Sequence, residues 1–453
     1  MYGQRDSTFM PNLIKKNKTT NRDVNVKIII IAGLALVLLI PAFMLGSLIS
    51  EREDRKESVI NEISSKWGSP QTVGGPVISV PFRVSSKDDK GRVTIETNYI
   101  HFLPNVLNVQ AELVPEIRYR GIYEAVLYSG KINIVALFSP IDFSGLGVSR
   151  SKIVKSGAIL SLGITDMIGI RDQVKLRVNG KQRSFEPGIK TTQVLLSGVS
   201  SSLSKMSGPL KVEITIDLNG SRSLQFLPVG KNTKVKMTSA WDSPSFHGAF
   251  LPVERDVTEN GFSANWNVLH LNRNYPQRWV GERFDIQPSA FGVKLHQSVD
   301  TYRKSMRMSK YAIMFIAFTF VAFFLSEILY SRPFHPVQYL LIGFALLIFY
   351  TLLLSFSEHV WFGFAYFISS TAIVALISLY SYGILVNKLF SSAVAGLLVI
   401  LYSYMYIVLQ LEDFALLMGS VGLFVVLSAI MYITRKIDWY AIGISTNPVK
   451  KEK

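Results

Sequence analysis

Long apolar runs lie near the start and throughout the last third of the chain, and short alternating runs fill the region between them. The first long run covers residues 28–49 and contains no charged residue. About 20 consecutive apolar residues carry a helix across the hydrocarbon core of a bilayer. The run is too long for the apolar core of a cleavable signal peptide, and no convincing small-residue cleavage pattern follows it. It therefore predicts an uncleaved transmembrane anchor helix at residues 28–49.

Five more apolar runs follow residue 308, and short polar segments separate them. They cover residues 311–329, 337–356, 361–386, 389–409 and 414–433. A buried core of soluble helices is the alternative interpretation, but five nearly uncharged runs of this length favour membrane spans. We therefore expect a five-helix transmembrane bundle at residues 309–434, which gives six spans in all.

The distribution of charge predicts how these spans are oriented, because cytoplasmic segments of membrane proteins are enriched in Lys and Arg. The first 27 residues are basic, and the breaks between spans alternate in charge. The basic breaks hold Arg332 and Lys388, and the acidic ones hold Glu358, Glu412 and Asp413. Both termini are therefore expected in the cytoplasm, as tails of residues 1–27 and 435–453.

Residues 50–308 combine a soluble composition with the two-residue periodicity of β-strands. A charged segment at 51–62 is expected to continue the anchor helix as a stalk, and residues 92–102 alternate clearly. Many short strands separated by Gly, Pro and Asn-Gly turns predict an all-β sandwich, either one large sandwich or two small ones. The predicted fold class is a multi-pass α-helical membrane protein with a large all-β, sandwich-like periplasmic domain.

Three local features of this domain give sharper expectations. Asn179-Gly180 predicts a tight hairpin turn between two short strands. Residues 212–218 predict a strand that ends at Asn219-Gly220, and residues 121–138 predict two strands broken near Ser129.

The chain is strongly basic, with a formal net charge of +16. Cytoplasmic tails explain part of this charge, and between residues 51 and 307 Lys and Arg still exceed Asp and Glu by about ten. Such an excess suits anionic lipid headgroups or anionic envelope polymers, although a solvated surface with a basic bias explains it more simply. We expect the lipid bilayer and a periplasmic envelope component or protein as partners, and no nucleic acid.

The chain has no cysteine, which excludes disulfides and thiolate chemistry. It also contains no phosphate-binding loop, dinucleotide fingerprint, zinc-protease helix or nucleophile elbow. No two of the six histidines stand at metal-ligand spacing: His101, His247, His270, His296, His335 and His359. We therefore expect no enzyme activity, no catalytic residue, no cofactor and no metal.

Two aromatic segments are the candidates for binding a ligand or partner. The first holds Trp241, Asp242 and Phe246, and the second runs from Trp266 to Trp279. Aromatic side chains in a groove stack on apolar groups or sugars. The simpler interpretation, a core Trp followed by a tight Pro turn, is favoured over such a groove.

Several motifs of the chain resemble the CreD family of inner-membrane proteins of Gram-negative bacteria, which are described as cell envelope integrity proteins. They include GGPVISVP at 74–81, IHFLP at 100–104, SAWDSPSF at 239–246, HPVQYL at 335–340 and IDWY at 437–440. The resemblance extends over nearly the whole chain. It implies a cell inner-membrane protein with a periplasmic domain, linked to envelope maintenance and often to a stress-responsive two-component system. It carries over no catalytic residue.

The leading functional hypothesis is a non-enzymatic inner-membrane protein that supports cell envelope integrity or the envelope stress response through its periplasmic β domain. The alternative is a transporter of lipid or a small molecule through the helical bundle, with tyrosines such as Tyr404 along its path. A third hypothesis is a hydrolase of cell-wall material that uses a carboxylate pair facing a cleft.

Overall fold

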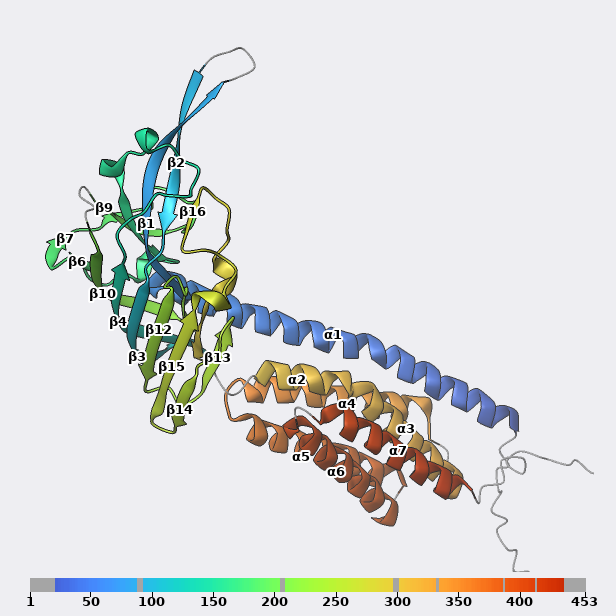
Figure 1. Ribbon diagram of the computed structural model, residues 1–453. Coiled ribbons are helices and arrows are strands. Elements are labelled where there is room, and N and C mark those ends of the chain that lie inside the picture. Colours follow the sequence, from blue (N-terminus) through green and yellow to red (C-terminus); the bar gives the residue numbers. More distant parts are fainter. Residues whose placement is uncertain are drawn as a thin grey trace, which may run out of the picture. The chain divides into compact units, whose positions relative to one another are not determined.

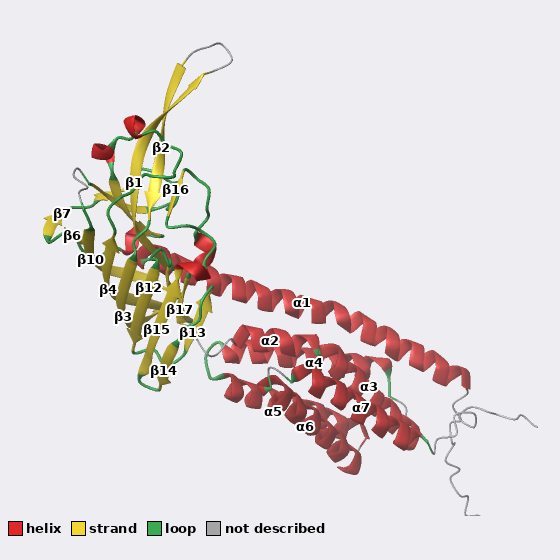
Figure 2. Ribbon diagram, viewed as in Figure 1, coloured by secondary structure: helices red, strands yellow, loops and turns green. Residues whose placement is uncertain are grey.

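The computed structural model describes residues 21–87, 93–203, 208–295, 301–330, 334–385, 388–411 and 414–435. The chain divides into two compact units, one of Met1–Glu53 with Asp300–Lys453 and the other of Asp54–Val299. The first unit is helical and the second holds the strands (Figures 1 and 2). This confirms the predicted combination of apolar helices with a large β domain.

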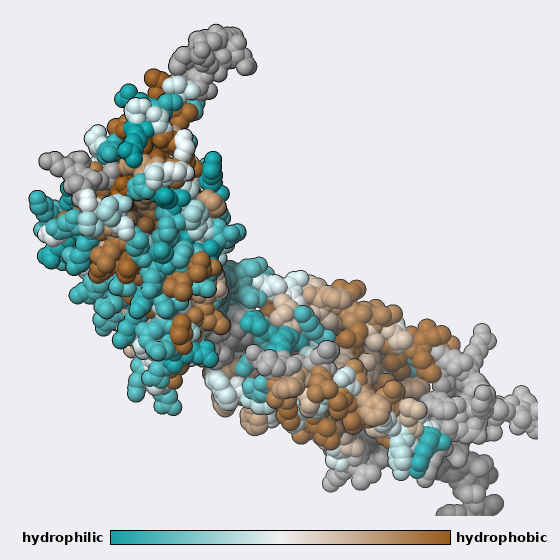
Figure 3. Space-filling view, in the orientation of Figure 1, coloured by the Kyte–Doolittle hydropathy of each residue, from teal (hydrophilic) through white to brown (hydrophobic). Residues whose placement is uncertain are grey.

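The helical unit contains the first part of α1 and six helices from the end of the chain. Their bounds are α1 (Asn21–Trp67), α2 (Thr301–Lys310), α3 (Ala312–Tyr330), α4 (Pro336–Ser357), α5 (Phe362–Leu385), α6 (Lys388–Gln410) and α7 (Ala415–Thr434). In the described part of the chain, α1, α4, α5, α6 and α7 are each long and apolar enough to cross a membrane. The pair α2 and α3, bent by 42°, counts as a sixth span if it is taken as one. On the face in view, the surface of this bundle is mainly hydrophobic (Figure 3).

Helix α1 packs into the bundle through a close contact in the apolar region. Leu38 is fully buried, and a Cβ atom added at Gly343 of α4 would overlap its side chain. A larger residue at this position would displace the Leu38 side chain, so glycine favours the close approach of the two helices.

Charged groups hold α1 to the bundle at both ends of its apolar stretch. Lys27 forms an ion pair with Glu327 of α3, and the Tyr339 hydroxyl donates to the same carboxylate at 3.4 Å. Further along the helix, Arg52 lies 3.9 Å from Glu358, which also accepts a hydrogen bond from Tyr302. The acidic break at Glu412 and the basic residues of both chain ends beyond Lys27 and Arg435 lie outside the residues whose side chains the structure describes.

The β unit consists of two sheets. The nine-stranded sheet contains β1 (Gln71–Lys87), β2 (Val93–Phe102), β5 (Ile159–Ile164), β8 (Glu186–Pro187), β9 (Gly198–Ser202), β11 (Ser223–Phe226), β13 (Pro244–Gly248), β16 (Arg278–Val280) and β17 (Phe291–Leu295). Its main path runs β13-β17-β11-β1-β5-β9-β8, while β2 joins β1 and β16 joins β2.

The eight-stranded sheet contains β3 (Val106–Arg120), β4 (Tyr123–Phe138), β6 (Lys175–Val178), β7 (Lys181–Arg183), β10 (Leu210–Ser221), β12 (Asn232–Ser239), β14 (Glu254–Thr258) and β15 (Gly261–Leu269). Its order is β14-β15-β12-β3-β4-β10-β6-β7. Buried residues of both sheets form one contiguous hydrophobic cluster. Rings from opposite sheets meet inside it, such as Trp266 and Phe291 with centroids 5.8 Å apart. The two sheets therefore enclose a single core.

The local expectations for the strands have mixed outcomes. The Asn179-Gly180 turn is confirmed, since β6 and β7 pair around it and both turn residues have positive φ. The predicted break near Ser129 is wrong, because β4 continues through this position and pairs with β3 along its whole length. The strand predicted at residues 212–218 is confirmed as β10, which ends at Ser221, directly after the expected Asn219-Gly220. At Ser129, pairing with the neighbouring strands outweighs the local turn signal.

The last turns of α1 dock onto the outer face of the eight-stranded sheet. Ile60 is buried against Ala125 and Leu127 of β4, and the Trp67 indole N–H donates to the Tyr128 carbonyl oxygen at 3.3 Å. Two ion pairs flank this contact: Glu57 with Arg222, and Glu62 with Arg120. The predicted helical stalk is therefore confirmed, and it is fixed to the β domain rather than free.

Candidate functional site

The structure separates the aromatic residues that the sequence singled out. Trp266 is 2% exposed and packs against Phe246, with ring centroids 5.8 Å apart. Trp241 is half-buried and its indole N–H donates to the Ser243 carbonyl oxygen, while the neighbouring Asp242 is exposed. Phe246 and Trp266 thus meet within the sandwich, where protein atoms cover nearly all of the Trp266 ring.

Trp279 packs in a different environment, beside a histidine. Its ring lies 5.5 Å from the ring of His101, which is fully buried on β2. His101 Nδ1 is 2.9 Å from the Ser79 hydroxyl, and Nε2 is 3.1 Å from Gln193 Oε1. Gln193 Nε2 in turn donates to Asn98 Oδ1, which orients the amide so that its oxygen faces the histidine.

Burial keeps His101 neutral in this network. Because Gln193 Oε1 can only accept, Nε2 carries the proton and Nδ1 accepts from the Ser79 hydroxyl. Burial lowers the pKa of His101 to about 4, against a smaller opposing effect of Gln193. A Ser beside a His resembles a nucleophile and its base, but Ser79 is only 2% exposed. The pair therefore satisfies buried polar atoms inside the core.

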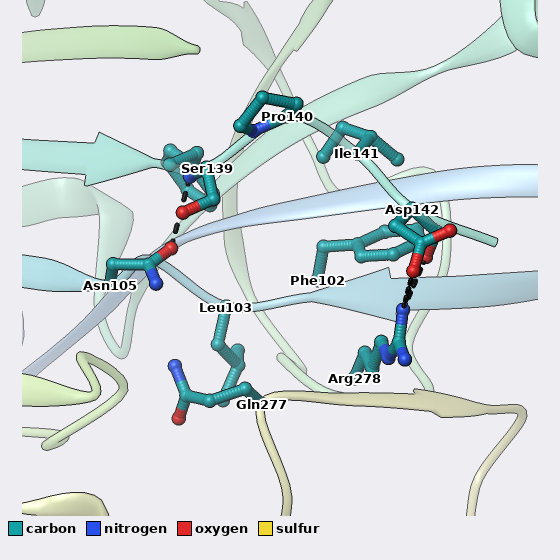
Figure 4. Close-up of a pocket in the computed structure, with 10 residues that line it drawn as sticks. Phe102, Leu103, Asn105, Ser139, Pro140, Ile141, Asp142, Gln277 and Arg278 are labelled. Carbon is teal, nitrogen blue, oxygen red and sulfur yellow. Dashed lines mark hydrogen bonds and ion pairs between the residues drawn. The ribbon is translucent and has the colours of Figure 1, made fainter. Parts of the chain in front are cut away.

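A cleft of about 220 Å³ opens beside β16, next in sequence to Trp279 (Figure 4). It lies between the end of β2, the segment after β4 and the start of β16. Its lining residues are Phe102, Leu103, Asn105, Phe138, Ser139, Pro140, Ile141, Asp142, Gln277 and Arg278. Apolar side chains and an ion pair thus share one small opening.

Hydrogen bonds hold the walls of the cleft in place. The Leu103 amide donates to the Gln277 carbonyl oxygen at 2.9 Å, and the Ser139 amide donates to Asn105 Oδ1 at 3.0 Å. Arg278 Nη1 donates both to Asp142 Oδ2 at 2.9 Å and to the Asp142 carbonyl oxygen at 2.7 Å. These hydrogen bonds therefore preform the cleft.

The charges of the cleft suit binding better than acid–base chemistry. The Ser144 hydroxyl, with the Ser144 amide and Arg278, holds the pKa of Asp142 well below its usual range. A carboxylate in this state neither donates nor takes up a proton near neutral pH. Asp142 and Arg278 lie 136 positions apart, so no signal in the sequence could have joined them.

Two further clefts lie on the outer face of the eight-stranded sheet, with volumes of about 540 and 270 Å³. Each of these three clefts is lined by one carboxylate: Asp142, Glu254 and Glu112 respectively. Within the described residues, no group of three or more His, Asp or Glu side chains could hold a metal ion.

The tyrosines of α6 have separate packing roles in the helical unit. Tyr402 is buried, and its carbonyl oxygen accepts from the Tyr366 hydroxyl at 2.6 Å. Tyr406 packs against the same Tyr366 ring, with centroids 5.2 Å apart. Tyr404 instead donates to the Met418 carbonyl oxygen of α7 and lines an apolar groove of about 480 Å³.

The buried neutral His101 makes the stability of the β domain depend on pH. In the unfolded chain the His101 imidazole takes up a proton near pH 6.5, whereas in the folded domain this imidazole stays neutral until about pH 4. Stability is therefore present above pH 6.5 and is lost as the pH falls, by about 2 kcal/mol at pH 5. Hydrogen exchange of the full-length protein, corrected for intrinsic rates, should show this loss in β1 and β2.

The His101→Gln variant tests the assignment. It should weaken protection at neutral pH but remove most of the slope between pH 7 and 5, whereas His270→Gln on a less buried histidine should retain the slope. An unchanged slope in His101→Gln would contradict this explanation.

Comparison with known proteins places this architecture in a family. Residues 23–440 match the family described as Inner membrane protein CreD. The chain is also 33% identical over 435 residues to the inner membrane protein CreD of Escherichia coli (strain K12), which covers 93% of this chain and 94% of that protein. These matches confirm the resemblance carried by the sequence motifs: the chain belongs to the CreD family of inner membrane proteins.

Proposed function

We propose that this CreD-family protein is a non-enzymatic support of the cell envelope. Residues 50–308 lie in the periplasm, where the β domain binds an envelope component or a protein partner. The anchor at 28–49 and the bundle at 309–434 cross the inner membrane six times, and both chain ends lie in the cytoplasm. The distribution of Lys and Arg supports this orientation.

The observation that carries the proposal is the docking of α1 onto the sandwich. The helix is unbroken from Asn21 to Trp67, so the apolar stretch that can cross a membrane continues into the part that packs on β4. Ile60 and the two flanking ion pairs then fix this end. A domain that only needed a tether would need none of these contacts, so the last turns of α1 belong to the fold of the β domain.

The clefts of the β domain support binding over catalysis. A glycoside hydrolase needs two carboxyl groups on opposite sides of the scissile bond. Each of the three described clefts offers one, and Asp142 is held in its charged form. This argues against the hydrolase alternative.

Cells that lack the gene should take up more dye and be more sensitive to detergent than cells with the intact protein restored. Ile60→Asp buries a charge in the docked interface, at a cost of several kcal/mol, and should restore the barrier poorly. Ser58→Asp adds the same charge at an exposed position two residues earlier and should restore it fully. Normal permeability of the deletion strain, even under envelope stress, would refute the envelope role.

The cysteine-free chain offers a direct test of orientation. Lys181→Cys in the β domain and Arg435→Cys after α7 each introduce a single exposed thiol. A membrane-impermeant maleimide should label the first in spheroplasts and the second only after lysis. Labelling of Arg435→Cys in intact spheroplasts would show that the chain end is not cytoplasmic.

The apolar groove in the bundle favours a second candidate function, the binding or transport of lipid. The groove has a volume of about 480 Å³, and α3, α6 and α7 line it almost entirely with apolar side chains. Such a lining suits an acyl chain. Gly419 on α7 lines the groove, and a Cβ there would meet open space.

Gly419→Leu should occupy part of the groove and lower the phospholipid that copurifies with the protein several-fold, as measured by mass spectrometry. Gly396→Leu is the matched control, because Gly396 on α6 is exposed, has equal room for a Cβ and does not line the groove. Equal lipid content in the two variants would rule out a specific lipid site there.

A further inference from the structure

The outer face of the eight-stranded sheet carries an ordered array of amides and lysines. Side chains alternate between the faces of a strand, so the outward residues of β3, β12 and β15 form cross-strand rows. In one row Lys236 stands between Gln110 and Asn265, and in the next Lys234 stands between Asn108 and Asn267. We call these six residues the amide–lysine face.

The amide–lysine face is accessible and hollowed. All six residues line the cleft of about 540 Å³, and five of them are exposed while Asn265 is half-buried. The smaller cleft of about 270 Å³ shares Gln110 and Lys236 and continues the same surface toward β4. Together the two clefts form a polar depression that crosses several strands.

Neither lysine of the face is neutralised. Among the residues that the structure describes, Lys234 and Lys236 take part in no ion pair or side-chain hydrogen bond, in contrast to Lys211, which lies 2.6 Å from Glu213. The larger cleft contains one carboxylate, Glu254, which accepts a hydrogen bond from Asn265 at 3.2 Å, and the smaller cleft adds Glu112 and Lys131. Lysines therefore outnumber carboxylates along the two clefts, and the four amides make the surface rich in hydrogen-bonding groups.

The composition of the face indicates what it binds. Protein interfaces are enriched in aromatic residues and depleted in lysine, whereas this face has no aromatic side chain, because Trp266 points into the core. Single-stranded nucleic acid needs stacking rings as well as a longer track of cations. Amides that donate and accept together suit the hydroxyl groups of sugars, and the lysines suit carboxylates carried by those sugars.

The spacing of the face also fits a glycan. Neighbouring strands lie about 4.8 Å apart, so each row presents one polar side chain per strand at that interval. A pyranose unit in an extended chain advances by a similar length. A glycan lying across the strands would therefore meet one amide or lysine per sugar.

We propose that the amide–lysine face binds an extended, carboxylate-bearing glycan that lies across β3, β12 and β15. This assigns a ligand class to the β domain and rests on the proposed function, which provides the envelope setting. The glycan carboxylates pair with Lys234 and Lys236, and its hydroxyl groups exchange hydrogen bonds with the flanking amides.

The test measures binding of a labelled oligogalacturonate to the full-length protein in nanodiscs of zwitterionic lipid, by fluorescence anisotropy at low and high salt. The double variant K234A/K236A should bind about tenfold more weakly, since it loses two charge-assisted hydrogen bonds. The control K181A/K211A removes two lysines outside both clefts and should bind as the wild type does. All four positions are exposed, so none of these changes disturbs the core.

Two further measurements separate a glycan from any polyanion. Asn108→Ala with Gln110→Ala should weaken binding of the oligogalacturonate and leave any weak binding of polyaspartate unchanged. Neutral dextran of matched length should bind more weakly than the oligogalacturonate.

Three outcomes would overturn the proposal: no binding of the oligogalacturonate, unchanged binding by K234A/K236A, or equally tight binding of polyaspartate. None of these would alter the permeability phenotype of the deletion strain. Conversely, if the thiol of Lys181→Cys were labelled only after lysis, the β domain would be cytoplasmic. That result would refute the periplasmic role without affecting glycan binding by the purified protein.

Discussion

The fixed attachment of α1 to the sandwich is the constraint on which the rest of this structure depends. One unbroken helix has to suit two environments in succession, apolar around Leu38 and polar beyond Glu51. A helix of this length would bend or fray at its free end unless tertiary contacts held it. Ile60 and Trp67 supply those contacts by covering part of β4. Docking therefore makes the last turns of α1 a structural element of the β domain.

The same attachment explains why the outer sheet face is divided. Beneath the helix, Ala125 and Leu127 point outward from β4 and are buried, whereas Lys131 and Asn133 further along the same strand are exposed or half-buried. All four stand on one face because side chains alternate along a strand. The helix covers the apolar end of this face, and the polar end carries the clefts. One strand thus contacts the helix with one half and lines a polar cleft with the other.

The sequence predicts the helical unit better than the site. Residues 337–356 and 414–433 match α4 and α7 closely, because length and lack of charge suffice to define a span. The sequence does not predict helix α2, because four basic residues interrupt its buried stripe of Tyr302 and Met308.

The strands and clefts of the β domain are harder to predict from the sequence, because they depend on contacts between residues far apart in the chain. Gly130 looks like part of a turn, yet β4 pairs with β3 and β10 through this position, and the Leu113 side chain packs over it. A single sequence also cannot join Asp142 to Arg278, or Gln110 to Lys236, because only the folded chain brings them together.

Three end strands of the two sheets carry residues that disfavour further strand pairing. Strand β14 is fully exposed and charged, and Pro244 and Pro187 lie in β13 and β8. Charges and prolines at edges oppose the addition of another strand. The edges of this sandwich are therefore poorly suited to pairing with a strand of another protein.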